Sequence, residues 1–89
     1  MSAKDRIYSK LQAAFSPSDL QVEDESHMHE GHSGARVGGE THFRVMIVSG
    51  AFEGVSRVAR QRLVHQALKE DLSSYIHALA LDIKADSEK

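Results

Sequence analysis

Apolar residues recur at helical spacing in two stretches of this chain. In the first, Ile7, Tyr8, Leu11, Ala14 and Phe15 form one stripe at i, i+1, i+4, i+7 and i+8, and Pro17 ends the pattern. In the second, residues 58–72 place apolar side chains on one arc and polar ones opposite, before two serines end it. Both stretches are predicted to be amphipathic helices. The arc of the second contains Leu63, Val64, Ala67, Leu68 and Leu72.

Alternation of apolar and polar residues predicts three strands. Residues 42–48 alternate most strictly, residues 20–24 form a shorter segment, and residues 76–83 place their leucines and Ile83 on one side. The resulting order is α-β-β-α-β, which indicates an α+β fold with helices packed on one face of a three-stranded sheet. Because a helix joins the second and third strands, that pair can be parallel through a right-handed crossover, giving a mixed sheet.

Size and composition set the limits of this fold. The chain has 89 residues, 40% of them hydrophobic, and a net charge of −2, which suits a single domain over residues 1–89 with a polar tail at 85–89. No apolar run reaches the ~18–20 residues of a membrane span, and no secretory signal pattern opens the chain. The absence of cysteine excludes disulfides and cysteine-only metal sites, and is compatible with the cytoplasm or an organelle matrix.

Histidine is the chemistry-bearing residue that the sequence offers in excess. Residues 26–41 contain four of the six glycines, show no periodicity, and carry His27, His29 and His32. His42 follows directly, and His77 opens the last predicted strand. Histidine is the commonest metal ligand and titrates near neutral pH, so the pattern fits either a metal site without its own thiolate or a hydrophilic loop. No catalytic triad or phosphate-binding loop is present, which argues against an enzyme.

Several motifs in a fixed order give the chain a family resemblance over residues 4–84. They are Glu25-Ser26, the segments Glu-Thr-His-Phe-Arg-Val at 40–45 and Phe-Glu-Gly at 52–54, Arg-Gln-Arg-Leu-Val-His at 60–65, and Ile-His-Ala-Leu-Ala-Leu at 76–81. With these motifs the chain resembles the BolA family, and the resemblance implies a fold like that of type II KH domains. Gln61 stands where the family usually has histidine, so this position is not required for metal binding here.

The resemblance also implies an iron–sulfur function. Family members partner monothiol glutaredoxins around a shared [2Fe–2S] cluster, for which the partner supplies one protein thiolate and one glutathione thiolate. The cluster-proximal histidine of the family falls on His77, and its second ligand falls on His29 in the loop, with His27 and His32 as further candidates. His42 is expected to orient the loop or to support another ligand. Alone, the chain is expected to hold no cofactor and to be a monomer or weak homodimer.

The family's second activity, DNA-binding transcriptional regulation, gives the alternative function. The candidate cations on the second helix and the turn before it are Arg57, Arg60, Arg62 and Lys69. However, Arg60 and Arg62 lie about 200° apart on a helix, and the net charge is negative. Gly50 and Gly54 are one residue too far apart for the Gly-x-x-Gly loop of KH domains. The sequence therefore favours the iron–sulfur adapter and keeps weak DNA binding as the alternative.

Overall fold

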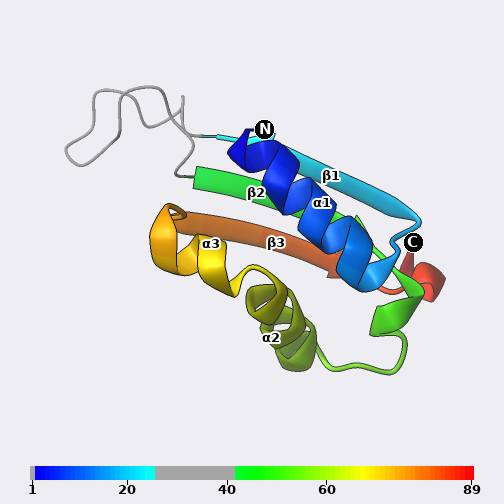
Figure 1. Ribbon diagram of the computed structural model, residues 1–89. Coiled ribbons are helices and arrows are strands. Elements are labelled where there is room, and N and C mark those ends of the chain that lie inside the picture. The colour runs from blue at the N-terminus through cyan, green and yellow to red at the C-terminus, as the bar shows by residue number, and fades with distance from the viewer. Residues whose placement is uncertain (1, 26–41) are drawn as a thin grey trace.

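The computed structural model describes residues 2–25 and 42–89, and its elements follow the predicted order (Figure 1). Helix α1 (Ala3–Phe15) precedes strands β1 (Asp19–Asp24) and β2 (His42–Val48). Two helices, α2 (Arg57–Ala67) and α3 (Lys69–Ser74), then lead to strand β3 (Ala78–Lys84). Short 3-10 turns, η2 (Gly50–Phe52) and η3 (Asp86–Glu88), follow β2 and β3. The predicted α+β class is thereby confirmed.

Helix α1 forms where the apolar stripe predicts it and has well-defined ends. The Ser2 hydroxyl accepts a hydrogen bond from the Asp5 N–H at 3.1 Å, which satisfies a free donor of the first turn. At the other end Ser16 has φ 44°, a left-handed conformation that stops the helix just before Pro17. Ile7 and Leu11 are fully buried against the sheet, so the stripe is the face that α1 contributes to the core.

The sheet is mixed, with strand order β1-β2-β3. β1 pairs antiparallel with β2, and β2 pairs parallel with β3 in a register that sets Val45 opposite Leu81. Val22, Phe43, Val45 and Ile47 on one sheet face are buried with the helices, whereas the alternate side chains of β1 and β2 are mostly exposed. The predicted mixed sheet with helices on one face is therefore confirmed.

The prediction of one continuous helix over residues 58–72 is wrong, and so is part of its predicted buried face. It divides into α2 and α3 at Leu68, which has φ −105° and ψ 16°, outside helical values. Within α2 the buried positions are Arg60 and Val64, one turn apart, while Leu63 is 43% exposed. Sequence patterning missed this because a charged residue occupies a core-facing position and an apolar residue lies beside it.

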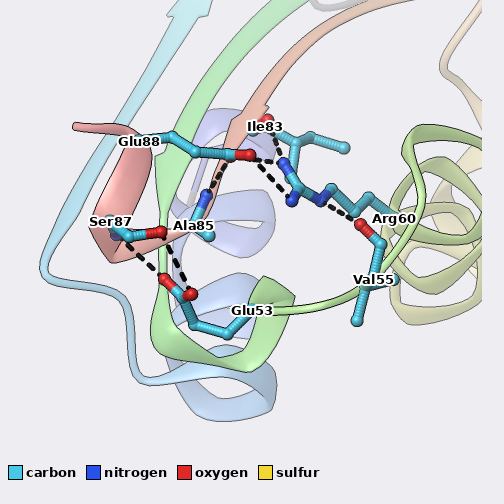
Figure 2. Close-up of polar contacts among 7 residues, drawn as sticks. All are labelled: Glu53, Val55, Arg60, Ile83, Ala85, Ser87 and Glu88. Carbon is cyan, nitrogen blue, oxygen red and sulfur yellow. Dashed lines mark hydrogen bonds and ion pairs between the residues drawn. The ribbon is translucent and has the colours of Figure 1, made fainter.

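The expected polar tail at residues 85–89 is instead part of the fold. Ala85 is only 1% exposed, and η3 follows it directly. The Ser18 hydroxyl donates to Asp86 Oδ1 at 2.7 Å, and the Ser87 N–H donates to Glu53 Oε1 at 2.9 Å (Figure 2). Polar composition hid this role, because the polar side chains here form hydrogen bonds to residues far away in the sequence. None of the helices in the described part of the chain is long and apolar enough to cross a membrane.

Candidate histidine site

His77 lies at one end of the sheet beside a second histidine. It occupies the bend between α3 and β3, is exposed, and directly precedes Ala78, which pairs in register with His42 on β2. The two imidazole rings have centroids 6.3 Å apart and an interplanar angle of 42°. The parallel pairing of β2 and β3 therefore brings together two histidines that are 35 positions apart in the sequence.

The two residues that flank the segment with the other candidate histidines lie at this same end of the sheet. The Glu25 N–H donates to the His42 carbonyl oxygen at 2.8 Å, and Arg44 Nε donates to Glu25 Oε2 at 3.1 Å. The residues that flank segment 26–41, Glu25 and His42, are thus held next to each other. The predicted ligands His27, His29 and His32 lie outside the described residues, so their assignment stays a prediction.

A buried polar cluster holds the turn before His77. The Asp71 carboxylate is 4% exposed and accepts hydrogen bonds from Lys10 Nζ and the Tyr75 hydroxyl, both at 2.5 Å. Burial alone would raise the pKa of Asp71, but the hydrogen bonds from Lys10 and Tyr75 outweigh it and leave that pKa below its ordinary value. The Asp71 carbonyl oxygen also accepts from the Ile76 N–H at 3.1 Å, so the residue next to His77 is tied to this cluster.

Aromatic contacts connect the same turn to β2 and α1. The Tyr75 ring packs edge-on against Phe43, with centroids 6.3 Å apart, and the Arg6 guanidinium lies 5.2 Å from the Tyr75 ring centroid. No motif or spacing in the sequence singles out Asp71. Nothing in the sequence separates it from exposed Glu70, because its burial depends on Lys10, far away in the chain.

The described residues by themselves do not make a complete metal site. Within 2–25 and 42–89, no group of three histidine, cysteine, aspartate or glutamate side chains gathers closely enough to hold a metal ion. An imidazole nitrogen can bind a metal only when it is unprotonated. A metal site that used exposed His77, with or without His42, would therefore need further donors beyond the described residues.

Arg60, a predicted DNA-contacting cation, is instead part of the fold. Its guanidinium is hydrogen-bonded at three nitrogens: Nε donates to the Val55 carbonyl oxygen at 2.8 Å, and Nη1 and Nη2 donate to the two Glu88 carboxylate oxygens at 2.5 and 3.1 Å (Figure 2). The hydrogen bonds that Arg60 donates to the Glu88 carboxylate raise the pKa of Arg60 above its usual value. With 8% of its surface exposed, Arg60 does not form a surface patch with Arg57, Arg62 and Lys69, which are exposed.

Comparison with known proteins identifies the family of this fold. Residues 11–88 match the family model described as "BolA-like protein". The chain is 46% identical over 85 residues to "Protein BOLA1, chloroplastic" of Arabidopsis thaliana, covering 93% of this chain and 53% of that protein. It is 39% identical over 88 residues to "DNA-binding transcriptional regulator BolA" of Haemophilus influenzae, covering 99% of this chain and 82% of that protein. The chain thus spans about half the length of the plant relative and most of the bacterial one.

Solved structures agree with the sequence comparison. The "BolA domain of SufE1 from Arabidopsis thaliana" superimposes with a TM-score of 0.88 at 43% identity, covering all of this chain and 98% of that one. The helices and the three-stranded mixed sheet described above are therefore the architecture of a BolA domain. The chain belongs to the BolA-like protein family.

Proposed function

We propose that this protein is a non-enzymatic iron–sulfur adapter, which contributes histidine ligands to a [2Fe–2S] cluster shared with a monothiol glutaredoxin. The observation that carries the proposal is the position of exposed His77 at the end of the sheet where Glu25 and His42, the residues that flank segment 26–41, also lie. A histidine of that segment can therefore complete a pair with His77. His29 is the expected second ligand, with His27 and His32 as the other candidates.

The residue inventory explains why a partner is needed. A [2Fe–2S] cluster is normally held by four cysteine thiolates, and two histidines replace two of them in Rieske-type centres. This chain has no cysteine, so the remaining thiolates have to come from a glutaredoxin cysteine and its glutathione. A protonated imidazole cannot ligate iron, so the shared cluster is expected to be lost as the pH falls. The absence of cysteine also suits a reducing compartment, either a bacterial cytoplasm or an organelle matrix.

His42 has a supporting role in this proposal. Its backbone is fixed by the register of β2, and its ring lies 6.3 Å, centroid to centroid, from that of His77. At this position it can orient the loop or assist a ligand through its second nitrogen. His42→Ala is therefore expected to weaken the shared cluster less than His77→Ala does.

Anaerobic reconstitution tests the proposal. The protein is mixed with a monothiol glutaredoxin, glutathione, iron and sulfide, and the visible absorption and circular dichroism spectra are recorded. A spectrum distinct from that of the glutaredoxin homodimer is expected, and it should be lost in His77→Ala. His65→Ala is the matched control, because His65 is exposed on α2 and should leave the spectrum unchanged. A spectrum that the wild-type protein does not alter contradicts the proposal.

A second candidate function is DNA binding, favoured by the name of the Haemophilus relative. Arg57, Arg62 and Lys69 are the exposed cations that would serve it. Phosphate contacts release counterions, so log K should fall steeply with log salt, by about 0.9 per phosphate neutralised. A flat or absent salt response for a duplex oligonucleotide removes this function.

A further inference from the structure

Strand β3 leaves one row of main-chain groups directed away from the sheet. The Ser49 N–H donates to the Lys84 carbonyl oxygen at 3.0 Å, so Lys84 turns its polar groups towards β2. In a parallel ladder the direction alternates from residue to residue. Leu79, Leu81 and Ile83 therefore direct their N–H and C=O groups towards the outer edge. Within the described residues no other strand pairs with this edge, since β3 is terminal in the order β1-β2-β3.

Arg60 reaches only one end of this edge. Its Nη1 lies 3.5 Å from the Ile83 carbonyl oxygen, between α2 and β3 (Figure 2). Among residues 2–25 and 42–89, no hydrogen bond engages the outward groups of Leu79 and Leu81. Natural edge strands are usually shortened, covered or charged to prevent pairing with another chain. Here the part of the edge formed by Leu79 and Leu81 is not covered in this way by the described residues.

A groove runs between this edge and α2. Arg57, Arg60 and Gln61 line it from the helix, and Leu81 through Lys84 line it from the strand, around a volume of about 430 Å³. Neighbouring strands lie about 4.8 Å apart, so an extended chain can occupy such a groove lengthwise. Leu79, Leu81 and Ile83 are only half-buried on the helix-facing side, so a further strand with apolar residues on that side would complete their burial.

The charges around the groove favour an acidic occupant. The Arg60 charge is already balanced by Glu88, whereas Arg57 and Lys84 are exposed and have no ion pair among those found in the described chain. Arg57 approaches from the helix side. Lys84 extends from the opposite face of the sheet, because its side chain alternates with that of half-buried Ile83. Two acidic residues among those described line the groove: Glu88, which is paired with Arg60, and Asp82.

We propose that the outer edge of β3 binds an extended, acidic segment of a partner protein as a fourth strand. Its main chain pairs with the outward groups of Leu79 and Leu81, its apolar side chains cover the half-buried leucines, and a carboxylate lies against Arg57. This is strand addition, in which main-chain hydrogen bonds provide affinity and alternate side chains provide specificity. The site is the edge of β3 that does not pair with β2, and it does not require the histidines.

Amide exchange with the intact protein tests this site directly. The probe is a capped peptide of about eight residues, added to the ¹⁵N-labelled chain. Alternate positions carry valines and one glutamate, which face the helices and Arg57, and the positions between them carry glutamates, which face the side of Lys84. When about 90% of the protein is occupied, exchange at the Leu79 and Leu81 amides should slow about tenfold, because these amides gain acceptors. The Ala80 and Asp82 amides already face β2 and serve as internal controls. Two peptides methylated at one or the other alternating set of backbone nitrogens complete the test, and only the peptide whose methyl groups face away from β3 should bind.

Matched charge reversals test the acidic preference. Arg57→Glu should raise the peptide's Kd by about 1.5- to 5-fold, as expected for one exposed ion pair. Arg62→Glu, on the same helix but outside the groove, should leave it unchanged. The proposal is overturned if the peptide shows no saturable binding, if Leu81 exchange is unaffected, or if both reversals act equally. It is also overturned if a single-stranded oligonucleotide protects these amides while the peptide does not, since the groove then binds nucleic acid.

Discussion

Removing the Asp71 carboxylate should destabilise the protein far more than its position on a short, mostly exposed helix suggests. Asp71 joins α1 to α3 through Lys10 and holds the Tyr75 hydroxyl, both at 2.5 Å. In Asp71→Ala the Lys10 ammonium, whose side chain is 36% exposed, returns to water at little cost. The half-buried Tyr75 hydroxyl instead loses its acceptor. A hydrogen bond to a charged group contributes about 1.5–3 kcal/mol, and a buried donor left without a partner costs about 1–3 kcal/mol.

We therefore expect Asp71→Ala to lower the free energy of unfolding by about 2–3 kcal/mol. For a domain of this size that corresponds to a fall in Tm of roughly 8–24 °C. Asp71→Asn keeps an acceptor for Tyr75 and should cost about half as much. Because the folded-state pKa is lowered, the carboxylate stabilises the fold fully above pH 3.8, its ordinary pKa, and this contribution is lost as the pH falls through the folded-state pKa.

Urea unfolding followed by circular dichroism at pH 7 and pH 3 measures both effects. Glu70→Ala is the matched control, because Glu70 is the exposed neighbour on the same helix and should change stability by less than about 0.5 kcal/mol. If Asp71→Ala costs no more than Glu70→Ala, the carboxylate is solvated and the reasoning is wrong. A loss that persists undiminished at pH 3 would place its origin in packing rather than in the ionised group.

Three further predictions concern other parts of the fold. The Arg60 guanidinium lowers the pKa of Glu88 to about 2, so the wild-type Tm should fall as the pH drops from 4.5 towards 2, and Glu88→Gln should flatten that fall in thermal melts. An equally steep profile in the variant would refute this. Phe52 is fully buried and its ring centroid lies 5.0 Å from that of Phe15, so Phe52→Ala should cost about 3–5 kcal/mol in urea unfolding, and a loss under about 1.5 would contradict the packing. Gly54 has φ 71° and open space where a Cβ would lie, so Gly54→Ala should cost about 1–2 kcal/mol in urea unfolding from backbone conformation alone, and Gly54→Asn less. Equal stability of all three proteins would argue against the positive φ.

The sequence predicts those parts of the fold that depend on local periodicity. The strands are visible because their buried and exposed residues alternate, and α1 is visible because its stripe is complete and its end has a proline. The break at Leu68 is not visible, because the apolar arc continues through it while the backbone changes direction. The structured segment after β3 is also hidden, since Asp86, Ser87 and Glu88 bond to Ser18, Glu53 and Arg60, which are far away in the sequence.

The histidine site was predictable to a similar extent. The family motifs single out His77, and the structure places it exposed at the sheet end. The proximity of His42 follows from the parallel register of β2 and β3, which no local pattern specifies. Among the cations, Arg60 could not be distinguished from Arg57 or Arg62 by sequence, because its burial depends on the carboxylate of Glu88.

The parallel pairing of β2 with β3 also has a consequence for synthesis. β2 is the central strand, but its second neighbour is made only after α2 and α3, and the turn after that neighbour is tied back to Ser18, Glu53 and Arg60. A growing chain that has not yet reached β3 has an open edge along Phe43, Val45 and Ile47, a row prone to pair with other chains. The sheet can therefore close only after β3 has been translated, and until then this edge of β2 is open to pairing with another chain.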